Sequence, residues 1–238
     1  MILVCSWDDG HPLDQRVAEL LQRHAFKGTF FVPLRNREGL PVLAPAALRA
    51  LAACHEVGSH THDHVYLRGL PEDVVRQQIC TGRERLESVL GRAIAGFCYP
   101  GGEYDATTVR LVREAGFRYA RSVENLVTAP PKDRYRVATT LQVYPHSAPI
   151  LANNLLRYPH RWRKAALLAR LCSARNLEER LRIAAAYARE QSGVLHIWGH
   201  SWELERHGLW ETLDRFLRWV SDTAPRSLSI SELMDACL

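Results

Sequence analysis

The sequence contains no long apolar run, no closely spaced pair of cysteines and no low-complexity segment. No stretch reaches the roughly 18 consecutive apolar residues that a membrane-spanning helix requires. The six cysteines lie far apart without a C-x-x-C pair, which excludes a disulfide framework and a zinc ribbon and favours a reducing compartment. The opening apolar run, residues 1–5, is too short for the core of a signal peptide. We therefore expect a cytoplasmic protein.

The composition is that of a folded α/β protein. The 238 residues are 47% hydrophobic and 24% charged, which excludes a disordered or fibrous chain and supplies a sizeable core. No repeat and no Gly/Ser linker divides the sequence. We therefore expect a single domain over residues 1–238.

Positive charge is concentrated in one segment. The net charge is +5, yet residues 134–177 carry eight cations and no Asp or Glu, which leaves −3 for the rest of the chain. Residues 146–176 are expected to form a helical insertion. Within it, residues 155–175 combine basic and apolar side chains, a pattern that would suit binding of an anionic substrate or of the inner face of a membrane. A solvated helical cover for the core is an equally open interpretation. Because no helix-turn-helix or zinc-finger pattern accompanies the cations, we do not expect nucleic acid as a partner.

Predicted strands and helices alternate along the chain, which indicates a parallel α/β architecture. The residue patterns predict strands at 2–5, 28–32, 56–58, 96–99, 117–121 and 193–198. They predict helices at 13–24, 45–54, 71–90, 106–115, 153–171, 177–190 and 209–220, and an extended segment at 134–144. Ser229 and Glu232 form a capping box before a short last helix. Since the carboxyl ends of parallel strands carry the active site, polar residues that follow strands are the candidates.

Acidic and imidazole side chains follow two of these strands. Asp8 and Asp9 follow the first strand, an arrangement that by itself would be an ordinary Asx turn with a helix cap. His60, His62 and His64 follow the third strand. One helical turn would bring His60 and His64 onto one face to hold a metal ion, or His60 and His62 would form an H-x-H pair from an extended segment. The sequence predicts a metal site with either geometry.

These clusters resemble the motifs of the polysaccharide deacetylase family, which is carbohydrate esterase family 4 or the NodB-homology domain. Residues 6–10, S-W-D-D-G, are similar to the T/S-F-D-D-G motif of the family, and residues 60–64, H-T-H-D-H, to its H-S/T-x-x-H motif. The strand at 28–32 is also similar, and the resemblance covers about the first 120 residues. It implies a distorted (β/α)7 barrel that removes an N-acetyl or N-formyl group from an amino sugar or glycoconjugate, including phosphate- or lipid-linked forms.

The resemblance also implies roles for individual residues. Asp9, His60 and His64 would hold one divalent ion, zinc in the first place, with cobalt, nickel or manganese as alternatives. Asp8 would be the general base for a metal-bound water that attacks the amide carbonyl. The N–H of Gly101 would stabilise the developing oxyanion.

The remaining motifs depart from the family pattern. Cys98 stands where many members carry an arginine, so the brace for the general base is missing or supplied elsewhere. His196 and His200 share one side of the last strand, and His200, at the strand end, is preferred as general acid. No acid of the fourth motif is evident between residues 117 and 144, so Glu203 would tune this histidine. Two further residues, Tyr99 and Trp198, are expected beside the substrate.

Two other functions compete with the deacetylase interpretation. One is a catalytically inactive carbohydrate-binding barrel, which Cys98 and the absent fourth motif would suit. The other is an amidohydrolase of a different class that uses His60 and His62, although that class usually places its H-x-H pair after the first strand. The intact acids and histidines favour the deacetylase.

Overall fold

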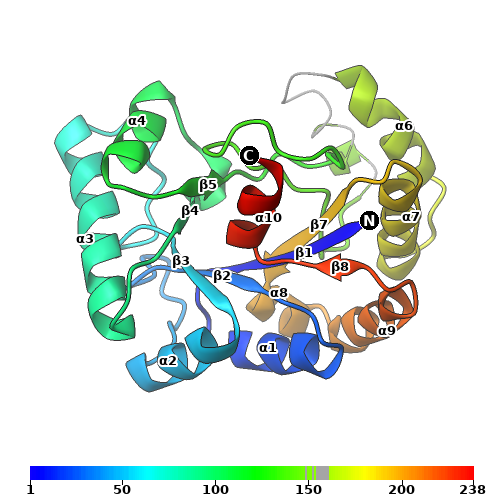
Figure 1. The fold of residues 1–238 in the computed structure, drawn as a ribbon, viewed down its shortest axis with the longest axis horizontal. Coiled ribbons are helices and arrows are strands. Elements are labelled where there is room, and N and C mark those ends of the chain that lie inside the picture. The colour runs from blue at the N-terminus through cyan, green and yellow to red at the C-terminus, as the bar shows by residue number, and fades with distance from the viewer. Residues whose placement is uncertain (148, 152, 154–160) are drawn as a thin grey trace.

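The computed structural model describes residues 1–147, 149–151, 153 and 161–238. Over these residues a curled sheet of parallel strands is surrounded by helices (Figure 1). The strand order is β5-β4-β3-β2-β1-β7-β6, and β8 also pairs with β1. The strands are β1 (Ile2–Asp8), β2 (Thr29–Val32), β3 (Glu56–Ser59), β4 (Gly96–Cys98), β5 (Tyr119–Arg121), β6 (Leu141–Gln142), β7 (Val194–His200) and β8 (Arg226–Ser227). The central strand β1 therefore lies between β2 and β7.

An extended segment joins the two edges of this sheet. Val137 forms a parallel bridge with Arg121 of β5, and its carbonyl accepts the N–H of Ser122 at 2.9 Å. Three residues on, the N–H of Thr140 donates to the carbonyl of His196 in β7 at 2.8 Å, and β6 follows along the same strand. The predicted extended segment at 134–144 thus connects the β5 edge of the sheet with β7. The expected distorted barrel is confirmed as a seven-stranded parallel sheet curled into a half-barrel.

Helices surround the sheet (Figure 1). These are α1 (Asp14–Arg23), α2 (Pro45–Cys54), α3 (Glu72–Leu90), α4 (Ala106–Glu114), α6 (Arg161–Leu171), α7 (Leu177–Glu190), α8 (Ser201–Arg206) and α9 (Trp210–Ser221), together with the 3₁₀ turn η1 (Pro100–Gly102). The longest, α3, follows Pro71, has two acids in its first turn and ends at Gly91 with φ +67°. These are the start and stop signals that the sequence predicted.

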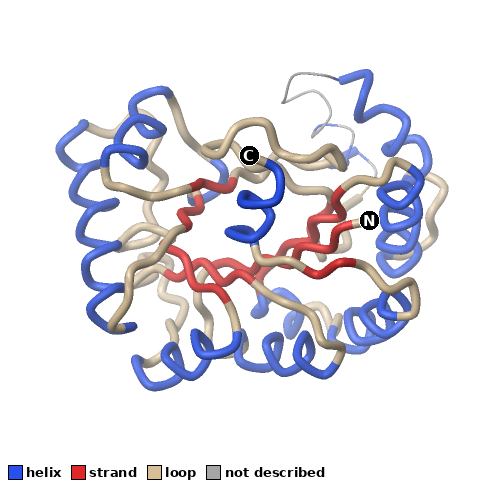
Figure 2. The backbone as a smooth tube through the Cα atoms, viewed as in Figure 1, coloured by secondary structure: helices blue, strands red, loops and turns tan. Residues whose placement is uncertain are grey.

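The last helix, α10 (Ile230–Cys237), closes the amino-terminal end of the barrel (Figure 2). Its buried side chains, such as Met234, pack inside the sheet against Val4 and Phe31. The capping box of Ser229 and Glu232 is confirmed at its start. With this end filled by side chains, the carboxyl ends of the strands are left for a site.

The elements differ from the predictions mainly at strand ends. β1 and β7 run on to Asp8 and His200, because both continue to pair with each other beyond the predicted bounds. The short elements α8 and β8 were not predicted. Residues 154–160 of the predicted helix at 153–171 lie outside the described residues, and its remainder forms α6.

Of the basic segment 155–175, residues 161–175 are described. There Lys164 is buried and pairs with Glu124 at 2.5 Å, and Arg170 pairs with Glu190 at 2.7 Å. These two cations are therefore engaged within the protein. None of the described helices is long and apolar enough to span a membrane.

Candidate active site

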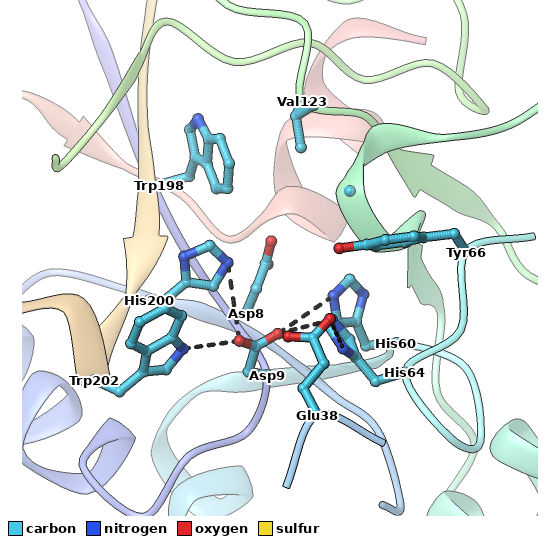
Figure 3. A pocket seen from close by; sticks show the side chains of 11 residues that line it. Asp8, Asp9, Glu38, His60, His64, Tyr66, Val123, Trp198, His200 and Trp202 are labelled. Carbon is cyan, nitrogen blue, oxygen red and sulfur yellow. Dashed lines mark hydrogen bonds and ion pairs between the residues drawn. The ribbon is translucent and has the colours of Figure 1, made fainter. Parts of the chain in front are cut away.

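A cavity of about 200 Å³ lies at the carboxyl end of the barrel (Figure 3). All but two of the predicted site residues line it, the exceptions being Tyr99 and Glu203. The lining residues are Asp8, Asp9, Glu38, His60, His64, Tyr66, Gly101, Val123, Trp198, His200 and Trp202. The strand ends therefore bring together residues that are up to 194 positions apart in the sequence.

The two adjacent acids point to different partners because the backbone turns between them. Asp8 is the last residue of β1, whereas Asp9 has a left-handed φ of +76°. Gly10 follows with φ +58°, and a Cβ there would lie 2.6 Å from a methyl group of Val32. Only glycine allows the chain to pass β2 this closely while turning. This turn separates the two carboxylates into distinct roles.

Hydrogen bonds hold the histidine loop to β2, α3 and β4: the N–H of His60 donates to the carbonyl of Val32 at 3.1 Å, and the N–H of His62 donates to the carbonyl of Gln78 at 3.0 Å. The Nδ1–H of His60 donates to the carbonyl of Cys98 at 2.9 Å, which leaves Nε2 free to face Asp9. The loop is not the predicted helical turn, because Thr61 and His64 have φ of +66° and +55°. His60 and His64 nevertheless lie together, with ring centroids 5.0 Å apart.

Asp9, His60 and His64 form a buried group that fits a divalent metal ion. One ligand atom from each lies within 4.8 Å of the other two. Asp9 Oδ1 faces both imidazoles, at 3.0 Å from His64 Nε2 and 3.8 Å from His60 Nε2. A carboxylate and two imidazoles are a donor set that zinc and related ions take, and three protein ligands leave positions open.

Two other candidate metal groups fit less well. Asp8, His60 and Cys98 meet the same distance criterion, but the guanidinium of Arg121 on Asp8 opposes a cation there. The H-x-H alternative fits less well because His62 is not among the residues that line the cavity, and its ring pairs with Asp63 at 2.8 Å.

Arg121 is the principal residue that sequence reasoning missed. It is the last residue of β5, is fully buried, and forms an ion pair with the carboxylate of Asp8. Burial alone would raise the pKa of Asp8, but the charges around it, Arg121 foremost, outweigh burial and lower it. Arg121 and Cys98 are direct partners in the β4–β5 register. The arginine absent at position 98 is therefore supplied from the neighbouring strand.

The two histidines of β7 have different environments. His200 lines the cavity, and its Nδ1 is 2.7 Å from Glu203. Burial alone would lower the pKa of His200, but the hydrogen bond to Glu203 and the nearby carboxylates raise it to about 9. His196 lies deeper, bound to Ser6 Oγ at 2.8 Å and to a backbone carbonyl, and burial lowers its pKa to about 3. Of the two histidines of β7, His200 is thus the one that stays protonated at neutral pH, and it is the one that lines the cavity.

Of the residues expected beside the substrate, Tyr99 lies elsewhere. Cys98 faces the barrel interior, so alternation along the chain turns Tyr99 outward, where it stacks on Tyr104 and its hydroxyl donates to the carbonyl of Tyr135. Trp198 does line the cavity and is held by a hydrogen bond from its Nε1 to Asn125 at 2.9 Å.

Four lining residues were not predicted from the sequence: Glu38, Tyr66, Val123 and Trp202. The Nε1–H of Trp202 donates to Asp9 Oδ2 at 2.8 Å, across 193 positions. Glu38 and Tyr66 come from loops that follow β2 and β3. The proximity of Trp202 to His200 in the sequence was the one local hint available.

Comparison with known proteins identifies relatives of the first half of the chain. The family model for polysaccharide deacetylase matches residues 2–120, half of the chain. A peptidoglycan-N-acetylglucosamine deacetylase of Bacillus cereus is 30% identical over 114 residues, 47% of this chain and 40% of the relative. The chain thus spans about half the length, or less, of the curated relatives that it matches.

Solved structures share the fold over the whole chain. A Mycobacterium smegmatis protein superposes with a TM-score of 0.69 at 18% identity, covering 99% of this chain and 89% of its own. A family 4 acetyl xylan esterase from Clostridium thermocellum, in complex with a cobalt ion, gives 0.62 at 17% identity over 99% and 91%. At these identities the likeness establishes the fold.

Proposed function

The chain belongs to the polysaccharide deacetylase family, and we propose that it is a metal-dependent hydrolase that removes the N-acetyl group of an amino sugar. The observation that carries the proposal is the arrangement of one cavity. Asp8 and His200 both line it beside the buried group of Asp9, His60 and His64. A carboxylate and a protonated imidazole at one amide can act as general base and general acid.

Each side chain has a task that follows from its environment. Asp8, kept ionised by Arg121, accepts a proton from the attacking water. His200, kept protonated by Glu203, donates a proton to the leaving amine. Gly101 lines the cavity, and its N–H would donate to the oxygen on which negative charge develops.

Asp9, His60 and His64 are the residues that would hold the divalent cation. When bound, the cation polarises the acyl carbonyl and lowers the pKa of water. Zinc is our first candidate because two imidazoles and a carboxylate suit it, and the cobalt ion in the Clostridium thermocellum relative supports a divalent site in this fold.

An N-acetylglucosamine residue is the proposed substrate unit. The name of the Bacillus cereus relative supports it, since that enzyme is a deacetylase of N-acetylglucosamine in peptidoglycan. The esterase name of another relative raises ester cleavage as a second reaction. Comparing N-acetyl and O-acetyl sugars in one assay separates the two activities.

The test is metal content followed by turnover. We expect about one divalent ion per chain in wild type purified without chelator, loss of the ion in Asp9→Ala and His60→Ala, and retention in His62→Ala, a control in the same loop. Wild type and His62→Ala should then release acetate from N-acetylchitooligosaccharides. A wild-type chain that stays metal-free after addition of zinc or cobalt would refute the proposal.

A further inference from the structure

Among the described residues, the cavity lining includes the partly exposed carboxylate of Glu38 and no cationic side chain other than histidine. The guanidinium of Arg37 lies over the ring of Tyr66, 5.3 Å from its centroid, and is not part of the lining. None of the described residues that line the cavity is Lys or Arg. Of the three carboxylates, Asp8 is paired with Arg121 and Asp9 belongs to the metal-binding group.

Glu38 remains, with 46% of its side chain exposed and its carboxylate 3.8 Å from His64 Nδ1, beyond hydrogen-bond distance. Its carboxylate accepts a hydrogen bond from the Tyr66 hydroxyl, which holds it against the cavity wall. A carboxylate has about four acceptor sites, so the exposed part of Glu38 can accept further hydrogen bonds from a ligand.

Backbone hydrogen bonds fix the loop that presents Glu38. The N–H of Arg35 donates to the carbonyl of His62 at 2.9 Å, which ties the start of the loop to the histidine loop. At the other end, the N–H of Leu43 donates to the carbonyl of Gly10 at 2.8 Å. Glu38 is therefore held between the two segments that carry the metal-binding residues.

Aromatic side chains form the walls on either side. Tyr66 lies on one side of the cavity, and Trp198 and Trp202 lie on the other (Figure 3). Aromatic rings offer apolar contact to the C–H faces of a sugar, and a few polar groups then fix its orientation. A partly exposed carboxylate in the lining accepts strong hydrogen bonds from hydroxyl groups, and it repels an anionic group at the same place.

We propose that Glu38 determines specificity, accepting hydrogen bonds from hydroxyl groups of the sugar that carries the acyl group and excluding sugars with a carboxylate or phosphate beside the amide. This inference rests on the proposed deacetylation and narrows its substrate to a neutral amino sugar. If the substrate is phosphate-linked, its phosphate would lie away from Glu38, because the two negative charges repel each other.

The test compares a neutral sugar with an anionic one. The methyl glycosides of N-acetylglucosamine and N-acetylmuramic acid differ by a lactyl ether at O3, which replaces a hydroxyl group and adds bulk and a carboxylate next to the amide. The bulk is the same for wild type and Glu38→Gln, so the change in preference between the two enzymes reports the charge and the hydrogen bonds of Glu38. We expect wild type to prefer the neutral sugar in kcat/KM, and Glu38→Gln to reduce this preference roughly tenfold or more, since tenfold corresponds to about 1.4 kcal/mol. The change should lie in KM rather than in kcat.

A matched control and two further readouts make the result decisive. Glu103→Gln removes a carboxylate that pairs with Arg68 outside the cavity lining, and it should leave the preference unchanged. Metal content should be unchanged in Glu38→Gln, and its loss would overturn the inference by indicating that Glu38 acts through His64. Binding of both glycosides, measured by calorimetry, reports selectivity without turnover.

The outcomes separate this inference from the proposed function. A metal-loaded wild type that binds the neutral sugar selectively but deacetylates neither sugar would contradict the proposed function and support the role of Glu38. A wild type that deacetylates both sugars equally well, with no change in Glu38→Gln, would support deacetylation and overturn the role of Glu38.

Discussion

Exchanging Arg121 and Cys98 tests whether the general base depends on a buried arginine that reaches it from β5. The two residues are direct partners on neighbouring strands, so the double variant Cys98→Arg/Arg121→Cys keeps the composition and the total side-chain volume. It returns the guanidinium to the strand where many family members carry it. The single variant Arg121→Cys removes the cation altogether.

The expected magnitudes follow from burial. Arg121 is fully buried and the side chain of Asp8 is 3% exposed, so removing one partner leaves an uncompensated charge at a cost of about 3–5 kcal/mol. Protonation of Asp8 reduces this loss of stability, because burial raises the pKa of Asp8 once Arg121 is removed. A protonated acid cannot serve as base, and we expect kcat/KM to fall by about 10²-fold or more.

The sign of the pH dependence is a second check. In wild type the lowered pKa of Asp8 contributes stability that is present above its ordinary pKa of about 3.9 and is lost as pH falls through the folded value. In Arg121→Cys the raised pKa reverses this, so stability is lost as pH rises. The deficit of the variant in urea unfolding should therefore be larger at pH 8 than at pH 5.

The assay is acetate release over a range of pH, with urea unfolding of the same preparations. We expect Arg121→Cys to shift the acid limb of kcat/KM to higher pH. The exchange variant should recover activity to within about tenfold of wild type, a difference of about 1.36 kcal/mol in activation free energy. Activity of Arg121→Cys within twofold of wild type, with an unchanged acid limb, would refute the reasoning.

Two further substitutions probe buried charges near the cavity. Glu203→Gln should lower the pKa of His200, because it removes a charge-assisted hydrogen bond worth about 1.5–3 kcal/mol. The alkaline limb of kcat/KM should therefore move to lower pH. The control Glu205→Gln, on the same helix, should leave this limb in place. Burial raises the pKa of Asp14 well above its ordinary range despite the Ser201 hydroxyl, so its contribution to wild-type stability is lost as pH rises. Asp14→Asn should therefore gain stability relative to wild type from pH 4 to pH 8 in urea unfolding, and an equal deficit at both pH values would contradict this assignment.

Much of the fold could be predicted because its signals are local. Short stretches of sequence specify the start and end of α3 and the capping box of α10. They also specify the alternation of apolar strands with amphipathic helices. Strand ends were less accurate, since β1 and β7 extend each other by pairing over their whole length. The turn at Thr61 escaped prediction because a spacing of four residues fits a helix and a left-handed loop equally well.

The sequence by itself determined the metal-binding candidates, because Asp9, His60 and His64 each lie at or just after a strand end. Carboxylate and imidazole groups can bind a metal ion wherever they occur, so these residues could be named without knowledge of their neighbours in space. The choice of His200 over His196 also followed from position along one strand.

Only the tertiary structure decided what surrounds these groups. The brace on Asp8 comes from Arg121, 113 positions away, and the hydrogen bond to Asp9 comes from Trp202, 193 positions away. No local periodicity specifies which residue of a distant strand faces the barrel interior at a given height. That is set by the register between strands and by the curl of the sheet, which exist only once the whole core has packed.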